Sequence, residues 1–526
     1  MTADPAARSL RRPLDAPCRP ARRALATLTL VAVACGWALA PAPASALDLL
    51  QAYEAAQRYD AQLNSARLQL SAIRERLPQA QAALKANVSA GAGVTAGRFD
   101  TDATAARSFD NVNGGINLSY PLYRPGSATL VDQTEITVRL AEVQLGLAEQ
   151  DLATRVADAY FDVLSAQDAV EVADAQRRAI TEQFESAKRN FEVGTATITD
   201  QQEAQARLDL NAAQLAAAGN DLAVRRAALA QLTGLDSAGL NTLKLDVPLP
   251  GAQPNDIDSW TARARETSYA VQQSELSAAI ARLEIDRARY AKRPVVDLVS
   301  QASLLKGKTA SASALTSPVD RTSTVSAGIQ LSVPLYSGGG LDARERETVA
   351  ALQQSESELE NARRLSEQGA RQAFLGLKSS AEQARALEAA VSSSRLALDS
   401  NLLGYQVGVR INVDVLNAQQ QLFSALRDLA RARYDVLLNS LRLRSTAGVL
   451  VPGDVAAINS LLSAPTERTF PILTGPGAVP GAGTAPGATP GAPGTSPVVP
   501  RNFGGRTTKP IAPGAPRPAP RNPPGR

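Results

Sequence analysis

Two parts of this chain repeat the same series of motifs, and this duplication constrains the fold more than any other feature. The segment 115–123, GINLSYPLY, recurs at 328–336 as GIQLSVPLY, 213 positions later. The segment 191–194, FEVG, recurs at 405–408 as YQVG, 214 positions later. Because the offset changes by one residue over this distance, we interpret the chain as two copies of one structural unit.

The two copies are placed at 47–255 and 256–464, and each is expected to hold an antiparallel coiled-coil hairpin, at 126–234 and 341–448. Each hairpin region lacks proline throughout, which suits long uninterrupted helices. Apolar residues recur every seven positions in both returning arms, a spacing typical of helices in left-handed coiled-coil contact. These residues are Leu208, Leu215, Leu222 and Leu229 in the first arm and Leu422, Leu429, Val436 and Leu443 in the second.

The outgoing helix of the first copy, 126–190, is much longer than its returning helix, 199–233. Helices at 48–84 and 270–290 have about the length that is missing. We therefore expect a short helix stacked on each returning arm, so that each copy has one continuous rod beside one broken rod.

A β-hairpin is expected before each coiled coil, at 87–123 and 295–336. Val88, Ala90, Ala92 and Val94 alternate with small or polar residues, and Ile116, Leu118 and Tyr120 do the same. This period of two predicts strands. The strands of the second copy are expected at 295–304 and 325–333, and the loops at 97–113 and 306–324, which gives four strands per chain.

The first 46 residues are typical of a secretory signal peptide. Arginines precede the apolar run 24–40, and Ala44-Ser45-Ala46 offers a cleavage site. Cys35 could instead be a lipidation site, although Ala32 stands where a larger aliphatic residue is usual. Both cysteines, Cys18 and Cys35, precede the predicted cleavage site, and the chain has no histidine. Zinc sites, disulfides and Ser-His-Asp catalysis are thereby excluded from the mature chain, and no metal or cofactor is expected.

The net charge of +4 lies entirely in the predicted signal peptide, since residues 1–46 hold six Arg and two Asp. The basic pI therefore gives no indication of nucleic-acid binding. The segment 465–526 has seven basic residues and one acid and is rich in Pro, Gly, Ala and Thr, which predicts disorder. It could contact acidic wall components or be an inert extension, and we favour the inert extension.

Strands of about ten residues with one apolar face, in a secreted chain, fit an outer-membrane barrel. A soluble sheet with one wet face has the same pattern. Four strands cannot close a barrel, and open strand edges are not tolerated in lipid. If the strands span a membrane, the chain must therefore oligomerise.

Over about 47–464, these features resemble the TolC family of outer-membrane efflux and type I secretion channels. The resemblance rests on the two strand-to-helix junctions ending at 121–123 and 334–339, on the Val-Gly turns of 190–194 and 404–408, and on the segment 413–416. It implies a mainly α fold with a β-barrel contribution: a homotrimer with a 12-stranded outer-membrane barrel above a periplasmic helical tunnel. It also implies an exit duct that contacts outer-membrane lipid and works with a periplasmic adaptor (membrane fusion) protein and an inner-membrane ABC or RND-type pump.

The resemblance also assigns candidate site residues at the far end of the helical hairpins. Thr199 and Asp200 match acceptors of a periplasmic gate, Tyr405 and Arg410 match their partners, and Asp414 matches a ring of acids facing the lumen. A second ring position is occupied by Asn417, which predicts a weaker field than two acidic rings give. The turn residues Val193, Gly194, Val407 and Gly408 match the tips that dock the adaptor.

Two other classes of function fit the sequence less well. A periplasmic coiled-coil adaptor or scaffold protein needs one helical hairpin, whereas this chain repeats hairpin and strands together. An enzyme is disfavoured because the sequence shows no glycine-rich phosphate loop and no nucleophile elbow. The substrate, the kind of pump and the role of the basic tail are not determined by the sequence.

Overall fold

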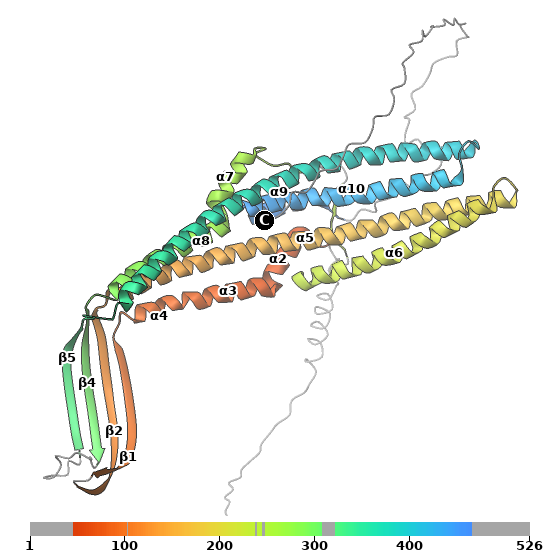
Figure 1. Ribbon diagram of the computed structural model, residues 1–526. Helices are drawn as coiled ribbons and strands as arrows, with labels where there is room; N and C mark the ends of the chain where they lie inside the picture. Colours follow the sequence, from red (N-terminus) through yellow and green to blue (C-terminus); the bar gives the residue numbers. More distant parts are fainter. Residues whose placement is uncertain (1–45, 102–103, 237–238, 245–247, 308–320, 465–526) are drawn as a thin grey trace, which may run out of the picture. The chain divides into compact units, whose positions relative to one another are not determined.

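The computed structural model describes residues 46–101, 104–236, 239–244, 248–307 and 321–464. Long helices dominate this part of the chain, and four strands form one sheet (Figure 1). Residues 1–45, which hold most of the predicted signal peptide and Cys35, and the tail 465–526 lie outside the described residues. The predictions made for those two segments therefore stay predictions.

Four long helices form two antiparallel hairpins. They are α5 (Pro125–Glu192), α6 (Ile198–Thr233), α9 (Gly340–Gln406) and α10 (Asn412–Thr446). The chain reverses at Gly194 and at Gly408, whose φ angles are 79° and 77°. Because a left-handed backbone is costly for residues with a Cβ, glycine at these two positions is what allows the sharp turn. The predicted outgoing and returning helices are thus present, with ends within two residues of those expected for the first hairpin.

The short helices lie beside the long ones, as the sequence predicts. In the first copy α2 (Leu49–Tyr59) reaches the end of α6, and α3 (Ala61–Arg74) and α4 (Arg76–Ala82) continue along α5. In the second copy α8 (Tyr269–Tyr290) lies between α5 and α9. It follows α7 (Ile257–Thr267), which packs against α9.

The single helix expected at 48–84 is wrong in detail, because the structure divides this segment into α2, α3 and α4. Asp60 has an extended backbone, and its side chain accepts a hydrogen bond from the amide of Leu63 at 2.7 Å. An aspartate in this role caps the start of a new helix. A helical period alone does not reveal a break at which the apolar face continues, which is why the sequence did not show it.

The largest apolar cluster joins both copies around the middle of α5. Phe161 stacks on Tyr434 of α10, with ring centroids 5.6 Å apart, and meets Tyr160 edge to face at 5.8 Å. The same cluster includes residues of α2, α6 and α11 (Pro452–Asn459). The short strands β3 (Thr242–Leu243) and β6 (Leu462–Ser463) form a two-stranded ladder, and their leucines belong to this cluster. The two copies therefore fold around one shared core.

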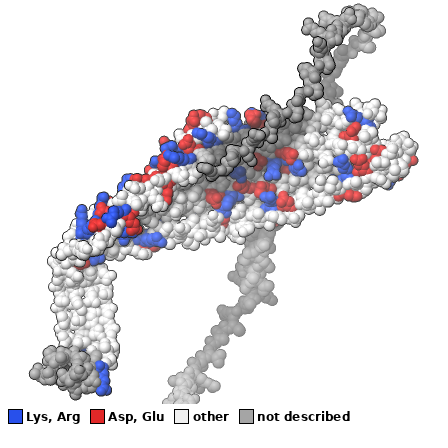
Figure 2. Space-filling model, viewed as in Figure 1, with Lys and Arg blue, Asp and Glu red and all other residues white. Residues whose placement is uncertain are grey.

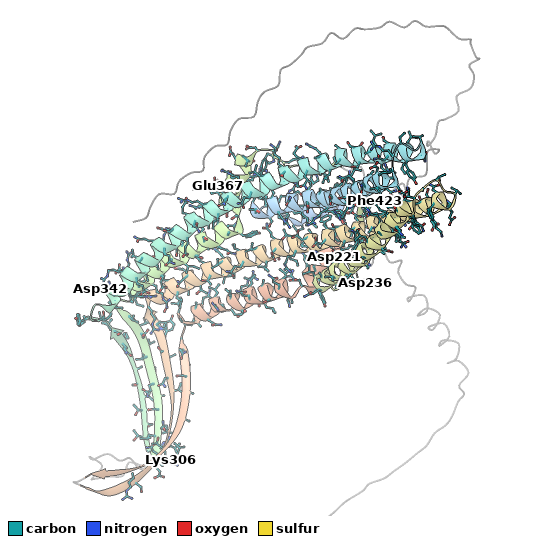
Figure 3. The ribbon with its side chains drawn as sticks, turned by 45° about the vertical axis from the view of Figure 1, so that its right-hand side comes forward. Asp221, Asp236, Lys306, Asp342, Glu367 and Phe423 are labelled. Atoms are coloured by element: carbon teal, nitrogen blue, oxygen red, sulfur yellow. The ribbon has the colours of Figure 1, made fainter. Side chains whose placement is uncertain are left out.

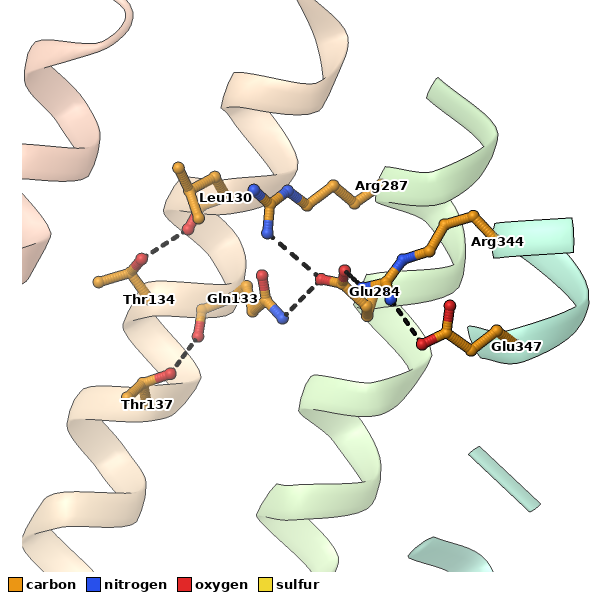
Figure 4. A network of polar contacts seen from close by, with 8 residues as sticks. All are labelled: Leu130, Gln133, Thr134, Thr137, Glu284, Arg287, Arg344 and Glu347. Carbon is orange, nitrogen blue, oxygen red and sulfur yellow. Dashed lines mark hydrogen bonds and ion pairs between the residues drawn. The ribbon is translucent and has the colours of Figure 1, made fainter. Parts of the chain in front are cut away.

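A polar network links α5, α8 and α9 nearer to the sheet (Figure 4). The carboxylate of Glu284 on α8 accepts hydrogen bonds from Gln133 at 3.2 Å, from Arg344 at 3.0 Å and from Arg287 at 3.4 Å. Burial alone would raise the pKa of Glu284, but these donors outweigh it, and its pKa lies below the ordinary value. Glu284 thus acts as a charged link between the two copies.

The strands form one antiparallel sheet in the order β1-β2-β4-β5. They are β1 (Asn87–Thr101), β2 (Thr104–Tyr123), β4 (Val295–Gly307) and β5 (Arg321–Ser332). The expected loop at 97–113 is wrong: the ladder continues through Gly97 opposite Phe109 and Arg98 opposite Ser108. Backbone pairing extends the strands beyond the residues whose alternation predicts them, because the ladder needs no apolar face.

None of the described helices is both long enough and apolar enough to cross a membrane.

Candidate functional site

The register of the sheet gathers the alternating apolar residues of all four strands on one face. Ile116 lies opposite Ala90 on one side and Ala302 on the other, and Ala302 lies opposite Val325. Since directly opposed residues of a ladder share a face, this row is apolar from edge to edge. The face consists mainly of Val88, Ala90, Ala92, Val94, Val112, Ile116, Leu118, Tyr120, Leu298, Ala302, Leu304, Val325, Ala327, Ile329 and Leu331.

The opposite face is mainly small and polar, although it includes Val299 and Leu305, and the middle of the sheet carries no charge. Ser89 lies opposite Asn117, and Asn117 lies opposite Gln301. The strands' charged residues stand near their ends, with Asp297 at the helix-proximal end and Lys306 and Arg321 paired at the other. Figures 2 and 3 show this uncharged sheet surface and Lys306 at its far end.

The uncharged length of the strands suits a membrane. Residues 111–123 of β2 and 322–332 of β5 contain no Asp, Glu, Lys or Arg. A strand needs about 9–11 residues to cross the hydrocarbon core when tilted. Residues Val325, Ile329 and Leu331 are 81%, 70% and 62% exposed, so this apolar face is uncovered in a single chain. An exposed apolar face of this extent is a lipid-facing surface.

The tips of the two helical hairpins also expose apolar side chains. Val193 is 73% exposed beside Gly194, and Val407 is 65% exposed beside Gly408. Val409 is 75% exposed in the second turn. The predicted docking residues therefore stand on the surface in both turns, where another protein can reach them.

Thr199 and Asp200 lie in the first turn of α6. Thr199 is exposed, and Asp200 is partly buried. The carboxylate of Asp200 accepts hydrogen bonds from the hydroxyl of Thr197 at 2.7 Å and from its amide at 3.0 Å. Since the Thr197 hydroxyl in turn accepts from the amide of Asp200, the two residues form a reciprocal cap. Asp200 thus has a local role within this chain.

The other gate candidates lie across the second tip. The hydroxyl of Tyr405 accepts a hydrogen bond from the side-chain amide of Asn190 at 3.3 Å, which joins the tips of α9 and α5. Arg410 lies 3.5 Å from the carboxylate of Asp414, one turn along the chain. Within one chain the structure therefore pairs Arg410 with Asp414, and it does not bring Arg410 or Tyr405 to Asp200.

Arg410 and Asp414 also line a recess of about 500 Å³ between α9 and α10. Asn417 lies on the same wall, one turn beyond Asp414. The side-chain oxygen of Asn417 accepts a hydrogen bond from Arg207 of α6 at 2.8 Å. The second ring position is thus neutral and bonded to a cation, which strengthens the expectation of a weak acidic field there.

Sequence reasoning missed a chain of polar contacts that ties the tips of the two hairpins together. The side-chain amide of Gln183 on α5 donates to Asn412 at 2.5 Å, and Asn412 donates to the backbone oxygen of Asp200 at 3.2 Å. Asn412 is 1% exposed. The available signal in the sequence was a polar residue, Asn412, at the first position of a returning helix, together with a glutamine, Gln183, on the outgoing helix of the other hairpin.

The fold and these surfaces define a class of protein: a helical hairpin bundle carrying a lipid-facing sheet, with exposed valines on the hairpin turns at the other end of the long helices. The solved structures that it resembles are outer-membrane channels. CusC matches with a TM-score of 0.65 at 18% identity, over 76% of this chain and 92% of that chain. The channel OprN matches with a TM-score of 0.65 at 18% identity, over 76% of this chain and 90% of that chain.

The sequence profile described as "Outer membrane efflux protein" matches residues 52–235 and 260–449, and the chain belongs to this family. The chain is 31% identical to the outer membrane protein TolC of Vibrio cholerae over 413 residues, 78% of this chain and 93% of that protein. It is 33% identical to the alkaline protease secretion protein AprF of Pseudomonas aeruginosa over 368 residues, 69% of this chain and 74% of that protein.

The predicted family, fold class and location are thereby confirmed. The protein is an outer-membrane exit duct for efflux or type I secretion. The alternative of a periplasmic adaptor or scaffold is set aside, since both copies of the unit match the channel family.

Proposed function

We propose that three copies of this chain form one conduit, with a barrel of 12 strands in the outer membrane and a tunnel of helices in the periplasm. The observation that carries the proposal is the sheet of β1-β2-β4-β5, whose outer strands each have an unpaired edge in the described chain. An unpaired backbone edge in lipid costs several kcal/mol for each unsatisfied group. The edges of neighbouring copies are the matching partners, and a closed ring leaves none unpaired.

Chemical crosslinking of the full chain in outer-membrane vesicles tests this assembly. An amine-reactive reagent of short span is expected to give bands at two and three times the chain mass and no larger ones. Bands that stop at the monomer, or a ladder that continues beyond three, would contradict the trimer.

We further propose that the helical tips form both the adaptor site and the gate. Val193 and Val407 are exposed on turns that Gly194 and Gly408 make possible. Each chain thus offers an adaptor two similar apolar contact points, one on each hairpin. An adaptor with its own coiled-coil tip would bury these side chains on docking. The pump, of the ABC or RND type, would then reach the duct through that adaptor.

The gate would consist of polar links made when copies meet at the tips. Thr199 is exposed in the first turn of α6, and the side chain of Arg410, in the turn between α9 and α10, is 57% exposed, so a neighbouring chain could reach both. Tyr405 holds the second hairpin to the first through Asn190. Three Asp414 carboxylates around the axis would attract cations and repel anions, as charged rings do in pores.

A further inference from the structure

The two outer edges of the sheet, on β1 and β5, can be matched to a seam that the chain already contains. Inside one chain, β2 of the first hairpin pairs with β4 of the second. Because the two β-hairpins of one chain are repeats of each other, a ring of chains would repeat this seam wherever β5 of one chain meets β1 of the next chain. The internal seam therefore serves as a template for the outer one.

The structure gives the equivalence between the two hairpins residue by residue. Val88 lies opposite Leu118 in the first hairpin, and Val296 lies opposite Leu331 in the second. Leu118 and Leu331 belong to the repeated motif, which makes Val296 the counterpart of Val88. The same offset relates the caps of the preceding helices, since Asp48 begins α2 where Asp256 begins α7.

We propose that β5 of one chain pairs antiparallel with β1 of a second chain, in a register that places Ile329 opposite Val94 and Leu331 opposite Ala92. The template pairs are Ile116 opposite Ala302 and Leu118 opposite Ser300. This inference rests on the proposed ring of copies, and it adds which residues meet across each boundary.

Side-chain exposure at the strand ends supports the match. Leu122 and Tyr123, beside the internal seam, are 50% and 45% exposed. Their counterparts Leu335 and Tyr336 are 93% and 90% exposed. The second pair is uncovered because no strand lies beside β5 in a single chain. A neighbouring β1 in the proposed register would cover these residues as β4 covers the first pair.

A repeated glycine supports the same register. A Cβ on Gly115 would lie 3.1 Å from the backbone oxygen of Ala302, so the internal seam requires close approach there. Its counterpart Gly328 has nothing within 4 Å of the corresponding point. The glycine at 328 has no steric reason within one chain, and the proposed register supplies one by placing a second copy's strand beside it.

Charge complementarity is also preserved. An ion pair between Arg124 and Asp297, at 2.6 Å, closes the helix-proximal end of the internal seam. The counterparts at the outer seam are Ser337 and Ser89, so both partners are neutral together. The register thus leaves no charge unpaired at the helix-proximal end, and it continues the apolar face, since Ile329, Leu331, Val94 and Ala92 all belong to that face.

Disulfide trapping in the full chain tests the register. The double variant Val94→Cys with Ile329→Cys probes the apolar face, and Gly91→Cys with Ser332→Cys probes the polar face. Both native cysteines, Cys18 and Cys35, precede the predicted cleavage site. Directly opposed residues have Cα atoms about 4.5–5.5 Å apart, within disulfide reach. Each variant is expected to give covalent multimers on non-reducing gels after mild oxidation.

The matched controls shift one cysteine by two residues on the same face: Ala92→Cys or Ala96→Cys, each with Ile329→Cys. Diagonal Cα separations of about 7–8 Å exceed disulfide geometry, so these controls should crosslink at least about tenfold less. Stronger crosslinking of a shifted pair would overturn the register. So would the absence of crosslinks from every pair while the wild type still forms a trimer with the amine reagent. Either result would leave the proposed ring of three chains intact. Loss of the trimer in that reagent would instead defeat the proposed function.

Discussion

At the scale of single residues, two glycines make the hairpin turns possible. Gly194 and Gly408 have left-handed φ angles of 79° and 77°, which glycine adopts at little cost, and the sequence predicted both as turn residues. Asp200 was predicted by resemblance as a gate acceptor, yet in the chain its carboxylate caps α6 through Thr197. A local capping pair three residues apart can be read from sequence. A contact between two chains cannot be tested within the structure of one chain.

Tyr160 is expected to contribute strongly to stability. Its side chain is fully buried, and its hydroxyl lies 3.0 Å from the backbone oxygen of Leu47 and 2.9 Å from that of Asn241. Tyr160→Phe would leave buried carbonyl oxygens without this donor, at a cost of about 1–3 kcal/mol. Thermal unfolding of the detergent-solubilised protein measures the effect. Tyr59→Phe is the control, since Tyr59 is 62% exposed, and an equal loss in both variants would contradict this role.

Glu284 gives the protein a defined loss of stability in acid. Because its folded pKa lies below the ordinary value of about 4.3, its contribution is present above that pH and is lost as the pH falls through the folded pKa. Glu284→Gln should therefore lower the unfolding temperature at pH 7, by an effect on the order of 1 kcal/mol for a partly exposed site, and have less effect at pH 3. A difference that persists or grows in acid would refute this linkage.

At the scale of elements, the sequence predicted which helices and strands exist and failed at their ends. The heptads of α6 and α10 follow their contact with neighbouring helices, and the alternation in β1 and β5 follows the difference between the lipid-facing face and the polar face. Both differences leave a periodic pattern in the sequence. The extension of β1 and β2 past Gly97 depends on backbone pairing, and the division of 48–84 at Asp60 depends on a local cap. Neither changes the apolar pattern, so neither was visible.

The seam between the two helical hairpins is incompletely packed around Asn211. A cavity of about 410 Å³ lies among α5, α6 and α10 and is lined by Asn211, Gln419 and Phe423. Figure 3 labels Phe423 on α10. Asn211 is 1% exposed, and neither polar atom of its side chain has a hydrogen-bond partner. A buried amide without partners costs free energy that an apolar side chain of similar volume would not.

Asn211→Leu is therefore expected to stabilise the protein, by about 1–3 kcal/mol. Its unfolding temperature in detergent should rise above that of the wild type. Val224→Ala on the same helix is a control for a change outside the cavity, because Val224 is 57% exposed, and it should change little. A lower unfolding temperature for Asn211→Leu would show that the amide is satisfied in the assembled protein, for instance by ordered water in the cavity.

At the scale of the whole molecule, the duplication explains both the shared core and the open sheet. Cores around Phe161 and Tyr434 need residues of both copies, so neither copy is expected to fold alone. The sheet has the opposite property: each hairpin is joined to the other along one edge only, and one edge of each remains free. The chain is thus complete as a folded unit and incomplete as a membrane structure.

The proposed gate at the hairpin tips is where this incompleteness can be measured. Arg410 and Asp200 are not in contact in one chain, so any link between them must form across copies. Removing either partner should then loosen the tips without unfolding the chain. Arg410→Ala and Asp200→Ala are each expected to raise single-channel conductance in planar bilayers several-fold, since the tips are the narrowest point that the gate proposal allows.

Two controls separate the gate from local effects on the helices. Thr197→Ala removes the cap of α6 but keeps the Asp200 carboxylate, and Arg385→Ala removes an exposed ion pair with Glu382 on α9. Both should keep the wild-type conductance. Wild-type conductance in both gate variants, or a conductance that rises equally in Thr197→Ala, would reject the link between chains and leave Asp200 as a helix cap.

Asp414→Asn tests the proposed acidic ring. It should lower the preference for cations over anions, measured as the reversal potential in a salt gradient, because it neutralises that ring.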